Sequence, residues 1–200
     1  MKTKDYFNSY IDLFLTQNAT LNLISKNDEK YLWEKHIFDS LSIEKFFEKF
    51  GNNFNTMLDF GTGGGFPSVP IAIAYPELKV TAVDSIRKKI NSICTLKNEL
   101  NLTNLTPICA RVETLTEKYD LVTSRAVASL DKLIEYAIPR LNDNGYFIAF
   151  KSRRASEEIK NSEKILKKHN AQIVDIIEYN LPLDENHIRN FVIIRKKQAK

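Results

Sequence analysis

The segment Met57-Leu58-Asp59-Phe60-Gly61-Thr62-Gly63-Gly64-Gly65-Phe66-Pro67 indicates how this chain folds. Four of the six glycines of the sequence lie in the five positions 61–65, between two apolar runs. This order predicts a strand, a glycine turn and a helix that begins at Pro67, where a missing N–H costs nothing. Glycine admits positive φ and close contact with the backbone, and a helix N-terminus offers free N–H groups. We therefore expect a nucleotide-like ligand at this turn.

Length and composition indicate one domain of ordinary size. The chain has 200 residues, of which 43% are hydrophobic, and this is enough for a sizeable core. No apolar run approaches the ~20 residues needed to cross a bilayer, and the first residues do not resemble a signal peptide. Cys94 and Cys109 lack a CxxC spacing, which favours free thiols. We therefore expect a cytoplasmic protein with no membrane partner. The formal charge of +4 permits a nucleic-acid partner without demonstrating one.

The chain shows different patterns before and after the glycine turn. Residues 3–17 and 28–50 follow a helical period, with Asn27 or Asp28 as the cap of the second helix and Gly51 as its end. After the turn, strands and helices alternate, which predicts a parallel sheet covered on both faces. The expected strands are residues 57–60, 78–83, 105–110, 120–123, 145–151, 172–179 and 188–195, and the expected helices between them are 86–100, 130–141 and 155–168.

These patterns predict an α/β fold with a seven-stranded, mostly parallel sheet preceded by N-terminal helices. No helix separates the last two expected strands, so we expect one antiparallel strand in the edge region of the sheet. The whole chain, residues 1–200, is expected to form a single domain. Within it, residues 1–52 are a helical extension and residues 53–200 are the α/β core.

The spacing of the glycines distinguishes two kinds of nucleotide-binding turn. The dinucleotide fingerprint is G-x-G-x-x-G, but Phe66 occupies its third glycine position, and a bulky ring there argues against a pyrophosphate passing close by. The alternative is an acidic residue followed by G-x-G-x-G, as in enzymes that use S-adenosylmethionine (SAM). Asp59 supplies the acid, and Gly61 and Gly63 supply the first two glycines. SAM is therefore the expected ligand, and a nicotinamide-dependent oxidoreductase is the alternative.

Two later turns of the predicted sheet are candidates for the same ligand. Asp84 ends the second strand, about 20 residues beyond the glycine turn, where a carboxylate can accept both hydroxyl hydrogen bonds of a ribose. Its alternative role is to cap the helix at 86–100. Val112 and Glu113 follow the third strand, in the turn that borders the adenine in this kind of fold. An ordinary solvated loop explains them equally well.

The turn after the fourth strand contains Arg125, where the reacting group usually lies. The chain has no Asn/Asp-Pro-Pro-aromatic turn for methylating exocyclic amines and no cysteine there for methylating a ring carbon. Lys35, Lys151 and Glu178 could supply three members of the Lys-Asp-Lys-Glu set of ribose 2′-O methyltransferases, but the Asp position holds Ser or Arg. What remains is a target with its own lone pair, such as a purine ring nitrogen, which needs alignment but no general base. Arg125 could hold a carboxylate, a phosphate or a guanine O6/N7 edge, or it could form a structural salt bridge.

Other polar residues have competing interpretations. His36 and Asp39 share one helix face, which suggests acid–base work, although the pattern slightly favours a packed His36 that fixes the helix over the sheet. The three histidines are far apart and show no metal-ligand spacing, so no metal is expected. Lys151, Arg153 and Arg154 follow a strand on the ligand side of the sheet and are candidate RNA contacts. Solvated surface charge is the alternative.

Several segments together resemble a known family. They are Asn22-Leu23, His36-Ile37-Phe38-Asp39-Ser40, Asp59 to Pro67, Asp84-Ser85, Arg111-Val112-Glu113 and Ser124-Arg125-Ala126-Val127-Ala128-Ser129. In these segments the chain is similar to the bacterial small-subunit rRNA guanine-N7 methyltransferases, also called glucose-inhibited division protein B. Four places depart from the family pattern: Ile24 replaces Thr, Gly63-Gly64-Gly65 replaces Gly-Pro-Gly, Lys35 replaces Arg and Ser152 replaces Gly.

The resemblance implies a Rossmann-like SAM-dependent methyltransferase fold and methylation of N7 of one guanine in 16S rRNA, in the hairpin near the decoding centre. It implies SAM contacts at Gly61, Phe66, Val112, Glu113 and Arg125. The implied partner is 16S rRNA or the small ribosomal subunit, and nothing in the sequence demands more than a monomer. Lys35 keeps the positive charge of the family's Arg, which makes it a further candidate RNA contact.

Overall fold

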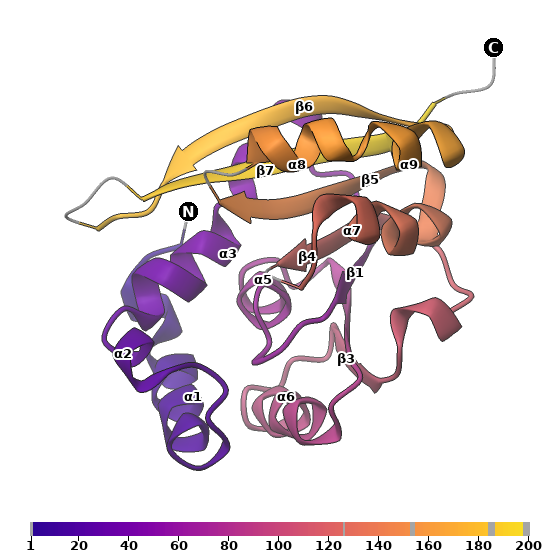
Figure 1. Ribbon diagram of the computed structural model, residues 1–200. Coiled ribbons are helices and arrows are strands. Elements are labelled where there is room, and N and C mark those ends of the chain that lie inside the picture. The colour runs from indigo at the N-terminus through magenta and orange to yellow at the C-terminus, as the bar shows by residue number, and fades with distance from the viewer. Residues whose placement is uncertain (1, 126, 153–154, 184–186, 198–200) are drawn as a thin grey trace.

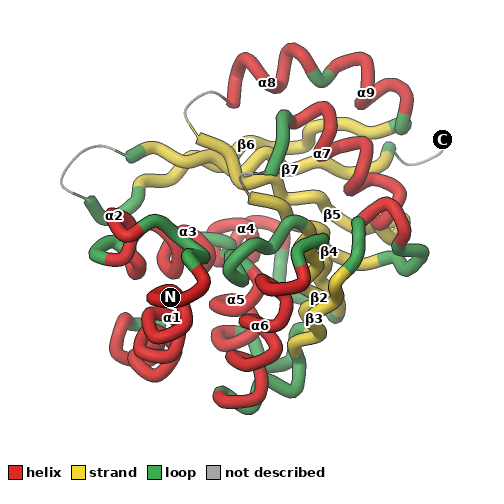
Figure 2. Tube along the Cα trace, turned by 60° about the horizontal axis from the view of Figure 1, so that its bottom comes forward, coloured by secondary structure: helices red, strands yellow, loops and turns green. Residues whose placement is uncertain are grey.

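The computed structural model describes residues 2–125, 127–152, 155–183 and 187–197, which form one sheet with helices on both faces (Figures 1 and 2). The strands are β1 (Thr56–Phe60), β2 (Lys79–Asp84), β3 (Leu105–Cys109), β4 (Tyr119–Arg125), β5 (Leu141–Ser152), β6 (Ala171–Asn180) and β7 (Ile188–Lys196). The α-helices are α1 (Asn8–Leu21), α2 (Lys26–Glu29), α3 (Asp39–Leu41), α4 (Glu44–Phe50), α5 (Ser68–Ala74), α6 (Arg87–Glu99), α7 (Leu130–Ala137), α8 (Ala155–Asn161) and α9 (Glu163–Lys168).

The seven-stranded sheet has the order β3-β2-β1-β4-β5-β7-β6. The first five strands pair in parallel, and β7 pairs antiparallel with both β5 and β6. The expected mostly parallel sheet with one antiparallel strand in the edge region is therefore confirmed. The antiparallel strand lies one position inside the edge, and β6 forms the edge itself. A short connection makes β6 and β7 antiparallel neighbours, and β7 fills the place beside β5.

Both faces of the central strands are buried, because helices cover each of them. Successive side chains of a strand point to opposite faces, so neighbouring residues enter different clusters. Met57 belongs to a buried cluster with residues of α1, α5 and α6, whereas its neighbour Leu58 belongs to a second cluster with residues of α7. Figure 2 shows the corresponding layers, with α7, α8 and α9 on one side of the sheet and the earlier helices on the other. The carboxyl ends of β1, β2 and β4 lie at one edge of these layers, where the ligand site of such a fold is expected.

The helical extension differs from the expected pair of long helices. A 3₁₀ turn (Lys4–Phe7) leads into α1, which continues four residues past the predicted end and stops at Asn22, whose φ is 50°. Asparagine tolerates this left-handed conformation, which ends helices. The predicted helix 28–50 is wrong as one element. It consists of α2, a π-helical turn (Trp33–Phe38), α3 and α4, and only its end at Gly51 is as expected.

Two predicted caps also differ from the structure. Ser25, rather than Asn27 or Asp28, caps α2, because its hydroxyl accepts a hydrogen bond from the backbone N–H of Asp28. Pro67 lies at the N-cap of α5 instead of the first helical position. The helix thus begins one residue later than the proline pattern predicts.

The N-terminal helices pack directly on the glycine turn. Phe14 lies near Gly64 and contacts the Phe66 ring, with 5.0 Å between the ring centroids. Phe14 is fully buried in the same cluster as Val69 of α5 and Ile93 of α6. The extension and the core therefore share one hydrophobic core.

Three further properties bear on the classes of function. No helix of the described residues has both the length and the apolar character needed to cross a membrane. Within the same residues, His, Cys, Asp and Glu form no group of three or more that could hold a metal ion. Cys94 and Cys109 are free thiols, each half-buried.

Candidate functional site

Two cavities lie at the carboxyl ends of the central strands. The first, here called the glycine-loop cavity, has a volume of about 440 Å³ and is lined by Phe60, Gly61, Val83, Asp84, Ser85, Lys89, Ala110, Arg111, Val112, Glu113, Val127 and Tyr136. The second, the arginine cavity, has a volume of about 510 Å³ and is lined by Asp28, Lys35, His36, Asp39, Arg125, Ala128, Phe150, Lys151, Ser152, Glu158, His187 and Arg189.

The structure sorts the predicted site residues between these cavities. Gly61, Asp84, Val112 and Glu113 line the glycine-loop cavity, and His36, Lys35, Arg125 and Lys151 line the arginine cavity. Asp59, Gly63 and Phe66 line neither of the two, and they lie behind the glycine loop or within it. Arg153 and Arg154 fall outside the described residues.

The glycine loop is a turn held open by positive φ angles. These are 67° at Gly61, 59° at Gly63 and 95° at Gly65, values that side-chain-bearing residues rarely adopt. The backbone N–H of Thr62 donates to Val83 of the neighbouring strand, at 3.0 Å. A Cβ added to Gly61 would collide with the methyl groups of Val127, whereas one added to Gly63 would meet no atom closer than 3.9 Å. The loop therefore needs glycine at position 61 both for its backbone angle and for close packing.

This difference predicts different effects of two alanine substitutions. Both Gly61→Ala and Gly63→Ala strain the backbone by about 1 kcal/mol. Only Gly61→Ala must also displace Val127 from the cavity wall, and overpacking of this kind costs about 1–3 kcal/mol. We expect Gly61→Ala to weaken SAM binding by about 5- to 150-fold relative to Gly63→Ala, as measured by calorimetric titration. Equal SAM affinities in the two variants would contradict the close packing at position 61.

Asp84 fixes the glycine loop from the next strand. Its Oδ2 accepts from the backbone N–H of Gly63 at 3.0 Å, and its Oδ1 accepts from the backbone N–H of Ile86 at 2.9 Å. The carboxylate is 8% exposed and borders the glycine-loop cavity. The capping role suggested by the sequence is wrong, because the N-cap of α6 is Ile86 and no side chain caps this helix. Each oxygen of Asp84 nevertheless keeps a further lone pair that can accept a ligand hydroxyl.

Val112 and Glu113 owe their position to a residue that the sequence did not single out. They lie in a 3₁₀ turn (Val112–Thr114) beside the glycine-loop cavity. Arg140 donates from Nε to the Val112 carbonyl at 3.2 Å and from Nη2 to the Glu113 carbonyl at 2.8 Å. The guanidinium therefore holds this wall of the cavity through the backbone.

Asp59 is a fully buried carboxyl group beneath the glycine loop. Thr123 donates to its Oδ1 at 3.0 Å, and its Oδ2 has no hydrogen-bond partner among the described residues. Burial raises the pKa of Asp59 to about 6, although the neighbouring Thr62 and Thr123 hydroxyls act in the opposite direction. An unpaired buried carboxylate oxygen is costly, and because Asp59 lines neither cavity, its charge reaches a ligand only across the glycine loop.

Arg125 is the last residue of β4 and joins the sheet to the helical extension. Its Nη1 donates to the Lys35 carbonyl at 3.1 Å and to Asp39 Oδ2 at 3.0 Å, and its Nη2 lies 3.0 Å from His36 Nδ1. The guanidinium carbon lies 5.2 Å from the centroid of the Phe66 ring, at cation–π distance. Three of its five N–H groups are thus used, and the guanidinium is fixed on the wall of the arginine cavity.

The π-helical turn (Trp33–Phe38) helps to place these partners. A π turn interrupts the regular α-helical hydrogen-bond pattern and often occurs at functional sites. Here the Lys35 carbonyl accepts from Arg125 and the His36 carbonyl accepts from the Ser40 hydroxyl at 2.6 Å. The irregular turn therefore supplies Arg125 with a backbone acceptor that helical periodicity does not predict.

His36 is held as a neutral imidazole. Burial and the neighbouring Arg125 lower the pKa of His36 to about 3. Arginine only donates, so Nδ1 is the accepting nitrogen and Nε2 carries the proton. Nε2 is buried and has no partner among the described residues. His36 thus acts as an acceptor for Arg125, and Asp39 bonds to Arg125 and not to the imidazole.

Asp39 is the centre of a buried polar network that the sequence did not reveal. Its side chain is 4% exposed, it accepts from the Tyr179 hydroxyl at 2.7 Å, and Arg189 Nε lies 4.0 Å away. The sequence indicated Asp39 by its spacing from His36 but gave no signal for Tyr179 or Arg189, which come from β6 and β7. The arginine cavity is therefore built from both ends of the chain.

Comparisons with known proteins agree with this architecture. The model of the GidB family, described as rRNA small subunit methyltransferase G, matches residues 3–188. The chain is 38% identical over 198 residues to "Ribosomal RNA small subunit methyltransferase G" of Bacillus subtilis strain 168, covering 96% of this chain and 82% of that protein. It is 37% identical over 199 residues to the protein of the same name from Listeria welshimeri, covering 96% and 83%.

Solved structures share the fold at low sequence identity. Magnesium protoporphyrin IX methyltransferase from Synechocystis PCC 6803, crystallised with bound SAM, has a TM-score of 0.67 at 20% identity and covers 96% of this chain and 95% of its own. TYW2 of M. jannaschii, in complex with AdoMet, has a TM-score of 0.59 at 18% identity and covers 78% and 74%. The structures show the fold alone, whereas the sequence matches span nearly the whole chain and show the family. The protein belongs to the rRNA small subunit methyltransferase G family.

Proposed function

We propose that this methyltransferase transfers the methyl group of SAM to N7 of one guanine in 16S rRNA. The supporting observation is that each carboxylate lining the arginine cavity is already bound to a cation. Asp28 accepts from Lys35 at 2.9 Å, Asp39 from Arg125 at 3.0 Å and Glu158 from Lys151 at 2.7 Å. A target that must lose a proton needs a free base. Guanine N7 has its own lone pair and needs only alignment with the methyl group.

The residues of the glycine-loop cavity fit SAM, the cofactor of this family. SAM supplies a methyl group activated by a positively charged sulfur. Asp84 borders the cavity with lone pairs that suit ribose hydroxyls, and the Asp59 carboxyl group, buried beneath the loop, supplies a negative charge that would favour the cationic groups of SAM. Val112 and Glu113 form the wall assigned to the adenine. Phe66 supports the site from behind, because it is buried against Arg125, His36 and the N-terminal aromatic rings.

Arg125 is proposed to hold the guanine. Its Nε–H and one Nη2–H remain after the contacts to the helical extension, and they form a side-on fork that suits a planar acceptor. Donation to guanine O6 leaves the N7 lone pair free for the methyl group. His36 and Asp39 are positioning residues in this proposal, because they keep the guanidinium in one orientation.

The charge of the arginine cavity suits an RNA partner. Four Lys and Arg side chains and three carboxylates line it, so a phosphate near its rim meets a net positive surface. Lys35 is 30% exposed and remains a candidate contact, and Arg153 and Arg154 stay candidates on the sequence pattern. We propose that the protein works as a cytoplasmic monomer on 16S rRNA or the small ribosomal subunit.

The alternatives from the sequence lose support. A ribose 2′-O site would bring Glu178 to Lys35 and Lys151, but Glu178 lines a different surface pocket, with Lys45 and Lys49. A dinucleotide enzyme of the Rossmann type has the parallel strand order 3-2-1-4-5-6, whereas here antiparallel β7 lies between β5 and β6.

A direct comparison of ligands tests this function. We expect the purified protein to bind SAM and not NAD in calorimetric titrations, and to transfer tritium from methyl-labelled SAM to 16S rRNA lacking modifications. Binding of NAD without binding of SAM would reverse the assignment. SAM binding without label transfer to either naked rRNA or small subunits would reduce the protein to a binding module.

A further inference from the structure

The segment Val127–Ser129, here called the partition segment, separates the two cavities. It follows Arg125 at the end of β4 and leads into α7, whose N-cap is Ser129. Val127 lines the glycine-loop cavity and Ala128 lines the arginine cavity. The methyl group must pass from the donor in one cavity to the acceptor in the other. The position of this segment therefore sets the distance and the angle between the two reactants.

One side of the partition segment rests on the glycine loop. The methyl groups of Val127 occupy the space that a Cβ of Gly61 would need. Val127 is nevertheless 45% exposed, so few neighbours hold it from the outside. This packing alone does not fix the segment, and a second attachment is needed.

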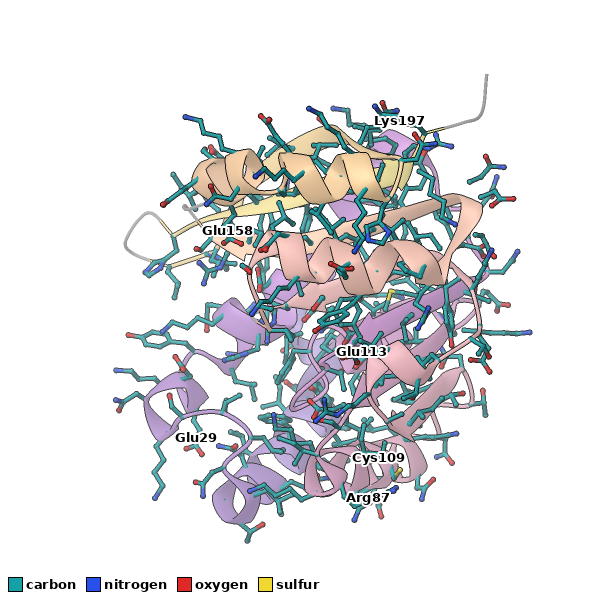
Figure 3. All side chains as sticks on the ribbon, turned by 45° about the vertical axis from the view of Figure 1, so that its right-hand side comes forward. Glu29, Arg87, Cys109, Glu113, Glu158 and Lys197 are labelled. Carbon is teal, nitrogen blue, oxygen red and sulfur yellow. The ribbon has the colours of Figure 1, made fainter. Side chains whose placement is uncertain are left out.

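Lys151 and Glu158 supply that attachment from β5 and α8. Lys151 Nζ donates to the Ala128 carbonyl at 2.9 Å and to Glu158 Oε2 at 2.7 Å. The same Oε2 accepts from the backbone N–H of Leu130, the first residue of α7, at 2.8 Å. Glu158, labelled in Figure 3, thus binds the residue after the partition segment, while Lys151 binds a carbonyl within it.

We propose that Lys151 and Glu158 are positioning residues for methyl transfer, which clamp the partition segment between the two cavities. This inference rests on the proposed function, because it assigns the segment to the path of the methyl group. Neither residue touches the reacting atoms in this role. Glu158 has no role suggested by the sequence, and Lys151 was expected to contact RNA phosphate.

Burial distinguishes the clamp from a phosphate contact at Lys151. The Lys151 side chain is 8% exposed, and two of its three N–H groups are used by the segment and by Glu158. By contrast, Lys35 is 30% exposed. A buried ammonium that already has a carboxylate partner gains little from an RNA phosphate. Its removal should therefore disturb alignment of the reactants more than affinity for RNA.

The test compares Glu158→Gln and Lys151→Met with the wild type. We expect kcat for methyl transfer to fall on the order of 10- to 100-fold, because small misplacements of reacting groups have effects of this size. The Kd values for SAM and RNA should stay unchanged, and so should the slope of log Kd for RNA against log salt. Hydrogen exchange of the Leu130 amide should be faster in Glu158→Gln, even without substrate.

The exposed pair Lys168–Glu135, which joins α9 to α7, gives a matched control. Glu135→Gln removes the same charge from the same helical layer and should leave kcat and Leu130 exchange unchanged. The clamp is overturned if Lys151→Met lowers the salt slope by about 0.7, the value for one single-strand phosphate contact. An unchanged kcat in Glu158→Gln would overturn it as well. The exchange measurement needs no substrate, so it separates failure of the clamp from failure of the proposed function.

Discussion

Replacing Arg125 by lysine should lower kcat for rRNA methylation by about 10²- to 10³-fold, the usual effect of removing one preorganised donor from a reacting centre. Lysine keeps the charge but has no planar fork. It cannot bond at once to Asp39, His36 and the Lys35 carbonyl, all of which Arg125 contacts. Steady-state kinetics with labelled SAM measures the loss. SAM affinity should change little, because Arg125 lines the arginine cavity and not the glycine-loop cavity.

A lysine substitution is a better test of Arg125 than alanine. Arg125→Ala should also abolish methylation, but it leaves Asp39, which is 4% exposed, without its closest cation. Loss of one partner of a buried ion pair costs about 3–5 kcal/mol. Tyr179 and Arg189 still contact Asp39 and soften this loss. Arg195→Lys is a matched control, since Arg195 packs over the Tyr146 ring at 5.1 Å, away from both cavities. Normal kcat in Arg125→Lys would exclude the proposed role.

Asp59→Asn should make the protein more stable at pH 8 and at the same time weaken SAM binding. Burial raises the pKa of Asp59 to about 6, from its ordinary value of 3.8. The folded state therefore binds this proton more tightly than the unfolded state. The stabilisation is fully present below about pH 4 and is lost as the pH rises through about 6. Asparagine resembles the protonated form of Asp59, so the variant keeps this stabilisation at high pH.

The expected gain follows from the size of the shift. Two pKa units correspond to roughly 3 kcal/mol, so the free energy of unfolding of Asp59→Asn should exceed that of the wild type by about this amount at pH 8 and by much less at pH 4. Denaturant titrations at the two pH values measure it. The same substitution removes the buried negative charge that the proposal sets beneath the cationic groups of SAM, so SAM affinity should fall about 30-fold, equivalent to about 2 kcal/mol.

Asp120 provides a control of opposite sign. Burial raises its pKa, but hydrogen bonds from Asn142 and from the Asn55 and Thr56 amides outweigh this effect, and the net pKa is lowered. A carboxyl group whose pKa is lowered in the folded state stabilises that state at pH values above its unfolded pKa. This stabilisation is lost as the pH falls through the folded pKa. Asp120→Asn should therefore be less stable than the wild type at pH 8. Equal pH dependence of stability in the wild type and Asp59→Asn would refute the role of buried Asp59.

The sequence predicts the elements of the fold better than their arrangement. Apolar runs such as Met57-Leu58 and the glycine cluster after them mark strands and the ligand turn, because backbone conformation and burial restrict residue type locally. The place of β7 beside β5 depends on pairing between distant segments, which alternation does not encode. The cap at Ser25 was placed wrongly because Asn27 and Asp28 are equally suitable capping residues. The π-helical turn was missed because the apolar period of Trp33, Ile37 and Leu41 continues through it.

The candidate site shows the same division. Gly61 and Asp84 are recognisable because their spacing reports a local backbone geometry. The partners of Arg125 are 86 and 89 residues away in sequence, at Asp39 and His36, and only the folded chain brings them together. Arg140 and Glu158 act on backbone carbonyl or amide groups, and a bond to backbone leaves no residue-type signature at the position it contacts.

The most direct test of the central proposal is to locate the methyl group on the RNA. Unmodified 16S rRNA, naked and in small subunits, is incubated with the protein and SAM, reduced with borohydride, cleaved with aniline and read by primer extension. Strand scission under these conditions marks N7-methylguanine. The proposal predicts one new stop at a single guanine near the decoding centre, which disappears with Arg125→Lys at matched times. Incorporation of labelled methyl groups into the RNA without any such stop would contradict methylation at N7.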